Sequence, residues 1–164
     1  MGLSSHQLAI GVTQEWLTPQ WILEPLGMFD LDPCAPELNK YWVNAKNFFN
    51  IYDDGLSKKW FGRVWLNPPF NRYQVGKWLE KMANHNNGIA LIPARTETEN
   101  FYKYVWEIAS GVLFIKTRPH FCYPNGLEAP FNSGAPICLI AYGEYNLKVL
   151  IKSGLGVTVK KYNI

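Results

Sequence analysis

The chain has 164 residues, of which 48% are hydrophobic and 18% are charged, and its formal net charge is +3. This length and apolar content predict one domain, residues 1–164, with a substantial core, and they argue against intrinsic disorder. No apolar run is long enough for a membrane span, and residues 1–16 lack the regions of a signal peptide, so we expect a cytoplasmic protein.

The first predicted elements are a short helix and a short strand. Thr18 followed by Pro19 is typical of a helix start, with an N-cap and a proline at the first helical position, and this helix must end by Gly27. Residues 28–32 are a strand candidate, which Pro33 ends because proline cannot continue a central strand.

The middle of the chain continues the alternation of helices and strands. Residues 36–50 suggest a helix rich in aromatic residues, residues 53–55 form a turn signal, and residues 63–66 predict a strand. The spacing i, i+3, i+4, i+7 of a helix with one buried face recurs in Val75, Trp78, Leu79 and Met82.

The second half begins with a strand at residues 88–93, whose apolar run is typical of a strand covered on both faces. A capping box at residues 96–99 opens the next helix, with a core stripe at Phe101, Val105 and Ile108. Three further strands are predicted at residues 112–117, 135–142 and 148–151, the last two as an antiparallel hairpin.

Alternating strands and helices predict a three-layer α/β domain with a mostly parallel sheet. In such sheets ligands bind at the carboxyl ends of the strands, where the strand order reverses. Three polar or proline-rich segments follow predicted strands and are therefore candidates for a site: residues 32–35, residues 67–70 and residues 93–96.

The sharpest of these signals is the turn Asn67-Pro68-Pro69-Phe70. Asn-Pro and Pro-Pro are also common in ordinary turns. The chemical interpretation is that two prolines fix the backbone and remove two N–H donors. The Asn67 side-chain oxygen and the Pro68 carbonyl then accept both hydrogens of a planar exocyclic amine, and Phe70 offers a stacking face. This arrangement is suited to amine methylation.

Metal chemistry is not indicated. The three cysteines, Cys34, Cys122 and Cys138, have no C-x-x-C spacing and are expected to be reduced thiols. His120 and Cys122 alone supply too few ligands for a zinc site.

The segments "EWLTPQWIL", "FDLDPCAPE", "YDDGLSKKW", "RVWLNPPF", "IPARTETENF" and "TRPHF" occur in an order and spacing that resemble the phage-type DNA N6-adenine methyltransferase (Dam) family. The turn itself resembles the Asp/Asn/Ser-Pro-Pro-Tyr/Phe/Trp motif of S-adenosylmethionine-dependent amino methyltransferases. The resemblance runs from about Glu15 to Phe131. It implies a Rossmann-like methyltransferase sheet, S-adenosylmethionine as cofactor, DNA as partner, and a phage or prophage gene expressed in a bacterial host, with restriction-modification as one possible setting.

The resemblance also implies roles for particular residues. Asp32 matches the acid of the family's first cofactor motif, although alone it is equally compatible with a solvated strand-end carboxylate. Two departures are Pro36-Glu37 in place of glycines and Phe70 in place of the commoner Tyr. The implied catalytic residues are Asn67, Pro68, Pro69 and Phe70, and the implied cofactor-binding residues are Thr18, Pro19, Asp32, Pro33, Cys34, Ala35, Asp54 and Asn67.

Because about thirty residues separate the strands that end at Asp32 and Leu66, the intervening strands are expected to be short or partly missing. These two strands should be neighbours, with Asp32 and Asn67 facing one crevice. Thr96 and Glu99 are assigned to helix capping. Candidate DNA-binding residues are Arg72, Arg95, Arg118, His120 and Phe121, the last three in a loop at residues 117–134.

The main hypothesis is direct methyl transfer to the exocyclic amine of a flipped-out adenine in DNA, by a monomer or weak dimer that has no metal and no separate target-recognition domain. The recognition site is then short or relaxed. Two alternatives stay open. One is an amino methyltransferase acting on RNA guanine or protein glutamine, and the other is a nucleic-acid-binding module without catalysis.

Overall fold

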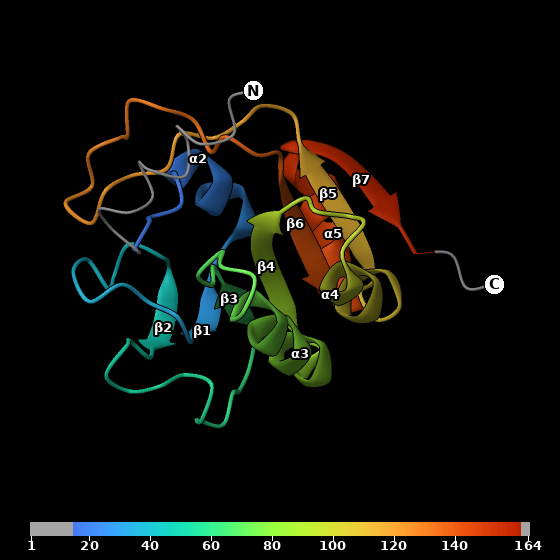
Figure 1. Cartoon of the computed structure of the whole chain (residues 1–164), viewed down its shortest axis with the longest axis horizontal. Coiled ribbons are helices and arrows are strands. Elements are labelled where there is room, and N and C mark those ends of the chain that lie inside the picture. The colour runs from blue at the N-terminus through green and yellow to red at the C-terminus, as the bar shows by residue number, and fades with distance from the viewer. Residues whose placement is uncertain (1–14, 162–164) are drawn as a thin grey trace.

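The computed structural model describes residues 15–161, in which a seven-stranded sheet carries helices on both of its faces (Figure 1). Across the sheet the strands follow the order β2-β1-β3-β4-β6-β5-β7. Their bounds are β1 (Phe29–Asp32), β2 (Ala45–Phe48), β3 (Val64–Leu66), β4 (Gly88–Pro93), β5 (Gly111–Ile115), β6 (Ile137–Tyr142) and β7 (Gly156–Lys160).

The sheet changes from parallel to antiparallel along its width. β1 pairs in parallel with β2 and with β3, and β3 pairs in parallel with β4. β6 runs antiparallel between β4 and β5, and β7 is antiparallel to β5. The predicted mixed α/β class is confirmed. The chain goes from β1 to β2 on one side and then to β3 on the other, so the strand order reverses between β1 and β3.

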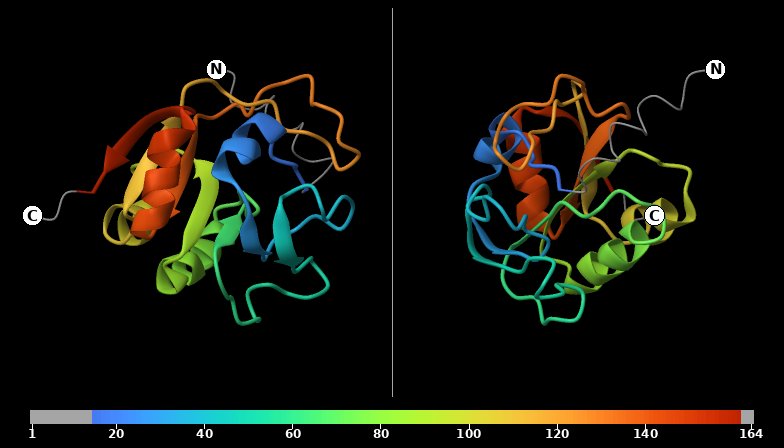
Figure 2. Two further views of the ribbon diagram at one scale, coloured as in Figure 1. Left: turned by 180° about the vertical axis from the view of Figure 1, so that it is seen from behind. Right: turned by 60° about the vertical axis from the view of Figure 1, so that its left-hand side comes forward.

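Helices cover both faces of the sheet, and Figure 2 shows α3 and α5 on opposite sides of it. On one face, Trp78 of α3 packs in the same buried cluster as Leu66. On the other face, Leu147 of α5 packs in the same buried cluster as Trp65. The first face carries α3 (Val75–His85), α4 (Glu99–Phe101) and the π-helical segment η2 (Tyr102–Trp106), and the second carries α2 (Gln20–Leu23), the 3-10 turn η1 (Glu24–Leu26) and α5 (Glu144–Ser153).

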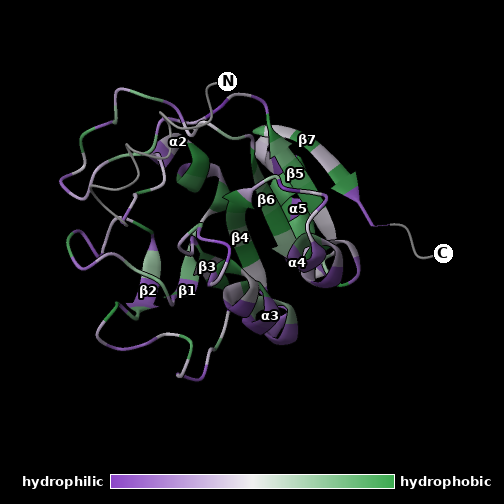
Figure 3. Ribbon diagram, viewed as in Figure 1, coloured by the Kyte–Doolittle hydropathy of each residue, from purple (hydrophilic) through white to green (hydrophobic). Residues whose placement is uncertain are grey.

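The central strands are apolar throughout because both of their faces are covered. β4 is buried from Gly88 to Ile92, and every residue of β6 is buried. Figure 3 shows hydrophobic colour along both strands, whereas α3 shows hydrophilic colour on its outer side. The predictions of strands at residues 28–32, 63–66, 88–93 and 112–117, and of the helix after Val75, are confirmed within a residue or two at most ends.

The predicted helix at residues 36–50 is wrong. The structure has irregular chain here, with Asn39 in the left-handed region (φ 58°), followed by the four-residue strand β2. Val43 is buried, whereas residues 37–41 are exposed. Leu38, Tyr41, Trp42 and Ala45 do follow helical spacing, but Leu38 and Tyr41 are exposed, so the structure gives this stripe no face to bury. One short strand, β2, lies beyond β1, in agreement with the expected reduction on this side.

The predicted hairpin at the C-terminal end is also wrong. Residues 148–151 belong to α5, in which Leu147 and Leu150 are three residues apart and buried. The strand that follows, β7, pairs with β5 instead of β6. Four residues are too few to distinguish the two-residue period of a strand from the 3.6-residue period of a helix. The helical period applies here because Leu150 is buried on the same side as Leu147, one turn earlier.

Two predicted helix starts are displaced. Pro19, not Thr18, is the N-cap of α2, and it offers no side-chain cap. Thr98, not Thr96, caps α4, because its hydroxyl accepts a hydrogen bond from the Phe101 N–H. Ile108, predicted as core, is exposed.

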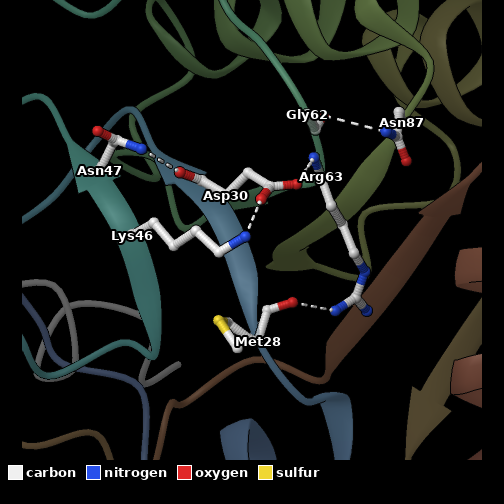
Figure 4. A network of polar contacts seen from close by, with 7 residues as sticks. All are labelled: Met28, Asp30, Lys46, Asn47, Gly62, Arg63 and Asn87. Atoms are coloured by element: carbon white, nitrogen blue, oxygen red, sulfur yellow. Dashed lines mark hydrogen bonds and ion pairs between the residues drawn. The ribbon is translucent and has the colours of Figure 1, made fainter.

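A polar network at the amino ends of β1 and β3 holds these two strands together (Figure 4). The Arg63 guanidinium is buried and donates hydrogen bonds to the carbonyls of Leu26 and Met28, each at 2.8 Å. The Arg63 N–H donates to Asp30, whose pKa is lowered by this bond and by the ammonium of Lys46. The network therefore fixes the two strands whose opposite ends form the candidate site.

Candidate active site

The predicted convergence of the first two strand ends is present in the structure. Leu31 of β1 lies opposite Val64 of β3, so the two strands are neighbours and run the same way. Asp32 closes β1, and Asn67 follows β3 directly. Both residues therefore lie at the carboxyl edge of the sheet, where the strand order reverses. Ligands bind at such edges in α/β proteins.

The side chain of Asn67 is held by a segment far away in sequence. Its Nδ2 donates a hydrogen bond to the main-chain carbonyl of Trp16 at 3.0 Å. Within residues 15–161 its Oδ1 has no hydrogen-bond partner. The amide oxygen is thus available as an acceptor.

The proline turn reaches the surface instead of being buried in the core. Pro68 is buried, whereas Asn67, Pro69 and Phe70 are half-buried. The Phe70 ring makes a T-shaped contact with Phe121, with centroids 6.0 Å apart and planes at 76°. Phe121 is buried and so supports Phe70 from within the protein.

Asp32 is a carboxyl group in an unusually dry place. It is 2% exposed, and its Oδ1 accepts a hydrogen bond from the Cys34 N–H at 3.1 Å. Burial raises its pKa to about 7, against the smaller opposing effect of that hydrogen bond. Burial, together with the charge of Asp32, also raises the pKa of the Cys34 thiol. A buried carboxyl with few hydrogen-bond partners is suited to binding a cationic group.

The turn after β1 is held by the segment that follows β2. The Phe49 N–H donates to the carbonyl of Asp32, and the Ala35 N–H donates to the carbonyl of Phe49, both at 2.9 Å. A Cβ on Gly55 would lie 2.0 Å from the Pro33 oxygen, so only glycine permits this close approach. Asp54, the residue before it, is exposed. The Asp54-Gly55 turn therefore lies directly against the Asp32-Pro33 turn.

Thr18 and Pro19 are both buried beside the start of α2. The Thr18 hydroxyl oxygen is buried without a hydrogen-bond partner among the described residues. Its main-chain carbonyl accepts a hydrogen bond from the indole N–H of Trp42 at 2.6 Å. An unpartnered buried hydroxyl is costly unless a ligand or water completes it.

The loop at residues 117–134 is attached to the segment before α2. Leu17 and Cys122 exchange main-chain hydrogen bonds of 2.9 Å in both directions. The rings of Trp16 and Tyr123 lie with centroids 5.3 Å apart. These contacts therefore hold the loop in place beside the proline turn.

The predicted DNA-binding residues lie in different environments. Arg72 is exposed and lies over the ring of Tyr73, 4.7 Å from its centroid. Arg95 is exposed after β4. Arg118 donates a hydrogen bond to the Gly134 carbonyl at 3.1 Å, and a ring nitrogen of His120 lies 3.0 Å from the Ala129 oxygen. These two side chains hold the loop in shape.

The sequence analysis missed several residues that build this region. Trp16 and Trp42 anchor the segment before α2, and the Tyr123 ring makes a tilted contact with that of Trp16. Gly55 sets the approach of its turn to Pro33. The Asp-Asp-Gly turn signal marked Gly55, but no local pattern could have paired Trp16 with Tyr123, which is 107 positions away along the chain.

Two cavities of about 220 and 200 Å³ lie away from the proline turn, one between η2 and β7 and the other between α2 and the start of β2. In residues 15–161 no three His, Cys, Asp or Glu side chains gather as metal ligands. No helix in the same residues has the length and apolarity to cross a membrane. Residues 1–14, which the signal-peptide prediction concerned, lie outside the described part.

Fold and strand-end residues together define a mixed α/β protein with a polar site where the strand order reverses. A family model described as DNA N-6-adenine-methyltransferase (Dam) matches residues 6–146. The chain belongs to this family, and the predicted resemblance is confirmed. No curated protein and no solved structure matches the chain.

Proposed function

We propose that this protein is an S-adenosylmethionine-dependent DNA adenine-N6 methyltransferase whose catalytic turn is residues 67–70. The observation that carries the proposal is the amide of Asn67, which follows β3 at the strand-order reversal; its Nδ2 is bound to Trp16, and its Oδ1 has no partner within residues 15–161. Membership of the DNA N-6-adenine-methyltransferase family supports adenine in DNA as the acceptor.

In this proposal the turn binds the target amine. The Oδ1 of Asn67 and the carbonyl of Pro68 accept the two amine hydrogens, which keeps the nitrogen lone pair out of conjugation with the ring. Acceptors that are fixed before charge develops stabilise the transition state without a cost of reorganisation. Phe70 offers its ring to the flipped adenine, and Phe121 keeps that ring in place.

The residues around Asp32 fit the proposed cofactor. S-adenosylmethionine would supply an electrophilic methyl group on a sulfonium, and it also carries an ammonium. A buried carboxyl with a raised pKa is stabilised as a carboxylate by a nearby cation. The Thr18 hydroxyl, which has no partner among the residues that the structure describes, offers a further hydrogen bond. Residues of the cofactor set are Thr18, Pro19, Asp32, Pro33, Cys34, Ala35, Asp54 and Asn67.

DNA would contact the same edge of the sheet. Arg72 and Arg95 are exposed near the turn and are suited to phosphates. The loop at residues 117–134, with Arg118 and His120, would read the bases around the flipped adenine. Because the proposal places all of these parts in one domain, we expect a short or relaxed recognition site.

The test is transfer of a labelled methyl group to adenine-unmethylated DNA, followed by identification of the modified nucleoside. N6-methyladenine should form with the wild type, and Asn67→Ala should reduce it by at least about a hundredfold, the loss typical of a missing transition-state hydrogen bond. RNA and protein serve as competing acceptors. Label in RNA guanine or protein glutamine, with none in DNA, would reject the proposal.

A further inference from the structure

The amide of Asn67 has a defined orientation that follows from its neighbour. The Trp16 carbonyl oxygen lies 3.0 Å from the amide nitrogen. A carbonyl oxygen accepts hydrogen bonds and cannot donate them. The amide therefore has to present its nitrogen to Trp16, and its oxygen faces away from that carbonyl.

The Trp16 carbonyl is itself fixed in place. The next residue, Leu17, is joined to Cys122 by two main-chain hydrogen bonds of 2.9 Å. The Trp16 ring packs on Tyr123 and against the buried cluster beneath α2 and α5. The Trp16 ring and the main chain of Leu17 therefore hold the Trp16 carbonyl in place when another residue replaces Asn67.

We propose that Trp16 is a positioning residue for methyl transfer, and that its main-chain carbonyl makes this protein require Asn, and not Asp, at position 67. The inference rests on the proposed role of residues 67–70. The amino-methyltransferase motif that this turn resembles has Asp, Asn or Ser at its first position. In Asn67→Asp, an ionised carboxylate would place an oxygen against the Trp16 carbonyl oxygen. Because both oxygens are acceptors, the carboxylate would turn out of the orientation that the Asn67 amide has in the wild type.

An aspartate at this position would function when it is protonated, since a carboxyl O–H can donate to the Trp16 carbonyl while the other oxygen accepts. The activity of Asn67→Asp, divided by that of the wild type at the same pH, should therefore rise as the pH falls. Division by the wild type removes the effects of neighbouring titrations. The titratable or charged side chains on the segments around position 67, among the described residues, include Glu15, Asp32, Cys34, Arg72, Tyr73, Arg95, Arg118, His120, Cys122, Tyr123 and Glu128.

The first measurement is methyl transfer between about pH 6 and pH 8. We expect Asn67→Asp to be at least about tenfold below the wild type at the upper end, the effect of one lost hydrogen bond to a partly buried partner. The deficit should shrink toward the lower end. Asn67→Ala should show a constant deficit because it has no group to protonate.

A matched control is Asn71→Asp, which adds the same charge close by. Asn71 Oδ1 accepts hydrogen bonds from the N–H groups of Tyr73 and Gln74, which a carboxylate keeps. Asn71 Nδ2 donates to Oε1 of the exposed Gln74 side chain, whose amide can rotate and donate to the new carboxylate instead. Its pH profile should run parallel to that of the wild type. An Asn71→Asp profile that recovers at low pH like that of Asn67→Asp would overturn the inference, because the effect would then be one of charge.

A second readout does not depend on activity. In Asn67→Asp, carbon NMR of the new carboxyl should give a pKa above the ordinary value of about 3.9, because the Trp16 oxygen disfavours the ionised form. A carboxyl that titrates at its ordinary pKa, or an Asn67→Asp variant as active as the wild type throughout, would overturn the inference. If the wild type transfers no methyl group, the proposed function fails, and the NMR titration still tests whether the Trp16 carbonyl disfavours an ionised side chain at position 67.

Discussion

The rings of Trp16 and Tyr123 lie 5.3 Å apart and join the segment that holds Asn67 to the loop that would read DNA. Removing the phenol ring in Tyr123→Ala should loosen the Trp16 carbonyl and lower kcat roughly twofold to tenfold, because an aromatic pair contributes about 0.5–1.5 kcal/mol. Tyr123→Phe keeps the ring and should keep kcat. Steady-state methyl transfer measures both. A higher KM for DNA with an unchanged kcat would mean that Tyr123 contacts DNA and does not position Trp16.

The buried carboxyl of Asp32 should make stability depend on pH. Its pKa of about 7 in the folded chain is above the ordinary 3.8, so between these values the folded chain binds more protons than the unfolded chain. The stabilising contribution is complete below the ordinary pKa and is lost as the pH rises toward 7. Urea unfolding should show a higher free energy of unfolding at about pH 5 than at about pH 8. Asp32→Asn should remove most of this difference, and an unchanged difference would assign it to other groups.

The thiol of Cys34 lies in the turn after β1, but it should take no part in the chemistry. Burial and the neighbouring charge of Asp32 raise its pKa, so it stays protonated and is a poor nucleophile. Cys34→Ala should therefore keep methyl transfer within about twofold, since one small half-buried side chain is shortened. Loss of methyl transfer with cofactor binding intact, measured by calorimetry, would contradict direct transfer.

Arg72 is the exposed cation nearest to the proline turn in sequence, and it should contact a phosphate. Arg72→Ala should weaken DNA binding to all sequences alike and reduce the slope of log K against log salt by about 1. Lys152→Ala, which removes an exposed cation at the end of α5, is the matched control. Fluorescence anisotropy over a salt series measures both slopes. Equal slopes for Arg72→Ala and the wild type would remove Arg72 from the DNA interface.

Local patterns predicted the elements that bury a regular apolar face. Strands β1, β3, β4, β5 and β6 and helix α3 lie where the sequence predicts them. Residues 36–50 misled because Leu38 and Tyr41 of the apolar stripe are exposed, and Trp42 bonds to the distant Thr18 carbonyl instead of lying on a helix face. Strand β7 was missed although Val157 and Val159 alternate with polar residues. Both valines are exposed, so the alternation is not that of a buried face.

The candidate site was predictable as far as it depends on chemistry at strand ends. Asp32 and Asn67 come together because their strands pair, and that follows from the order of strands in the sheet. The Trp16 carbonyl that orients Asn67 was not predictable, because a main-chain acceptor leaves no trace in the sequence. The same holds for the Thr18 hydroxyl, whose lack of a partner within the described part of the chain is visible only in three dimensions.

The most direct test of the account is a single-turnover experiment with adenine-unmethylated DNA and labelled S-adenosylmethionine, comparing the wild type with Asn67→Ala while cofactor binding is measured in parallel. The account predicts N6-methyladenine with the wild type, and for Asn67→Ala a rate lower by at least about a hundredfold, with a loss of cofactor affinity much smaller than the loss of rate. Equal rates for the two proteins would contradict it.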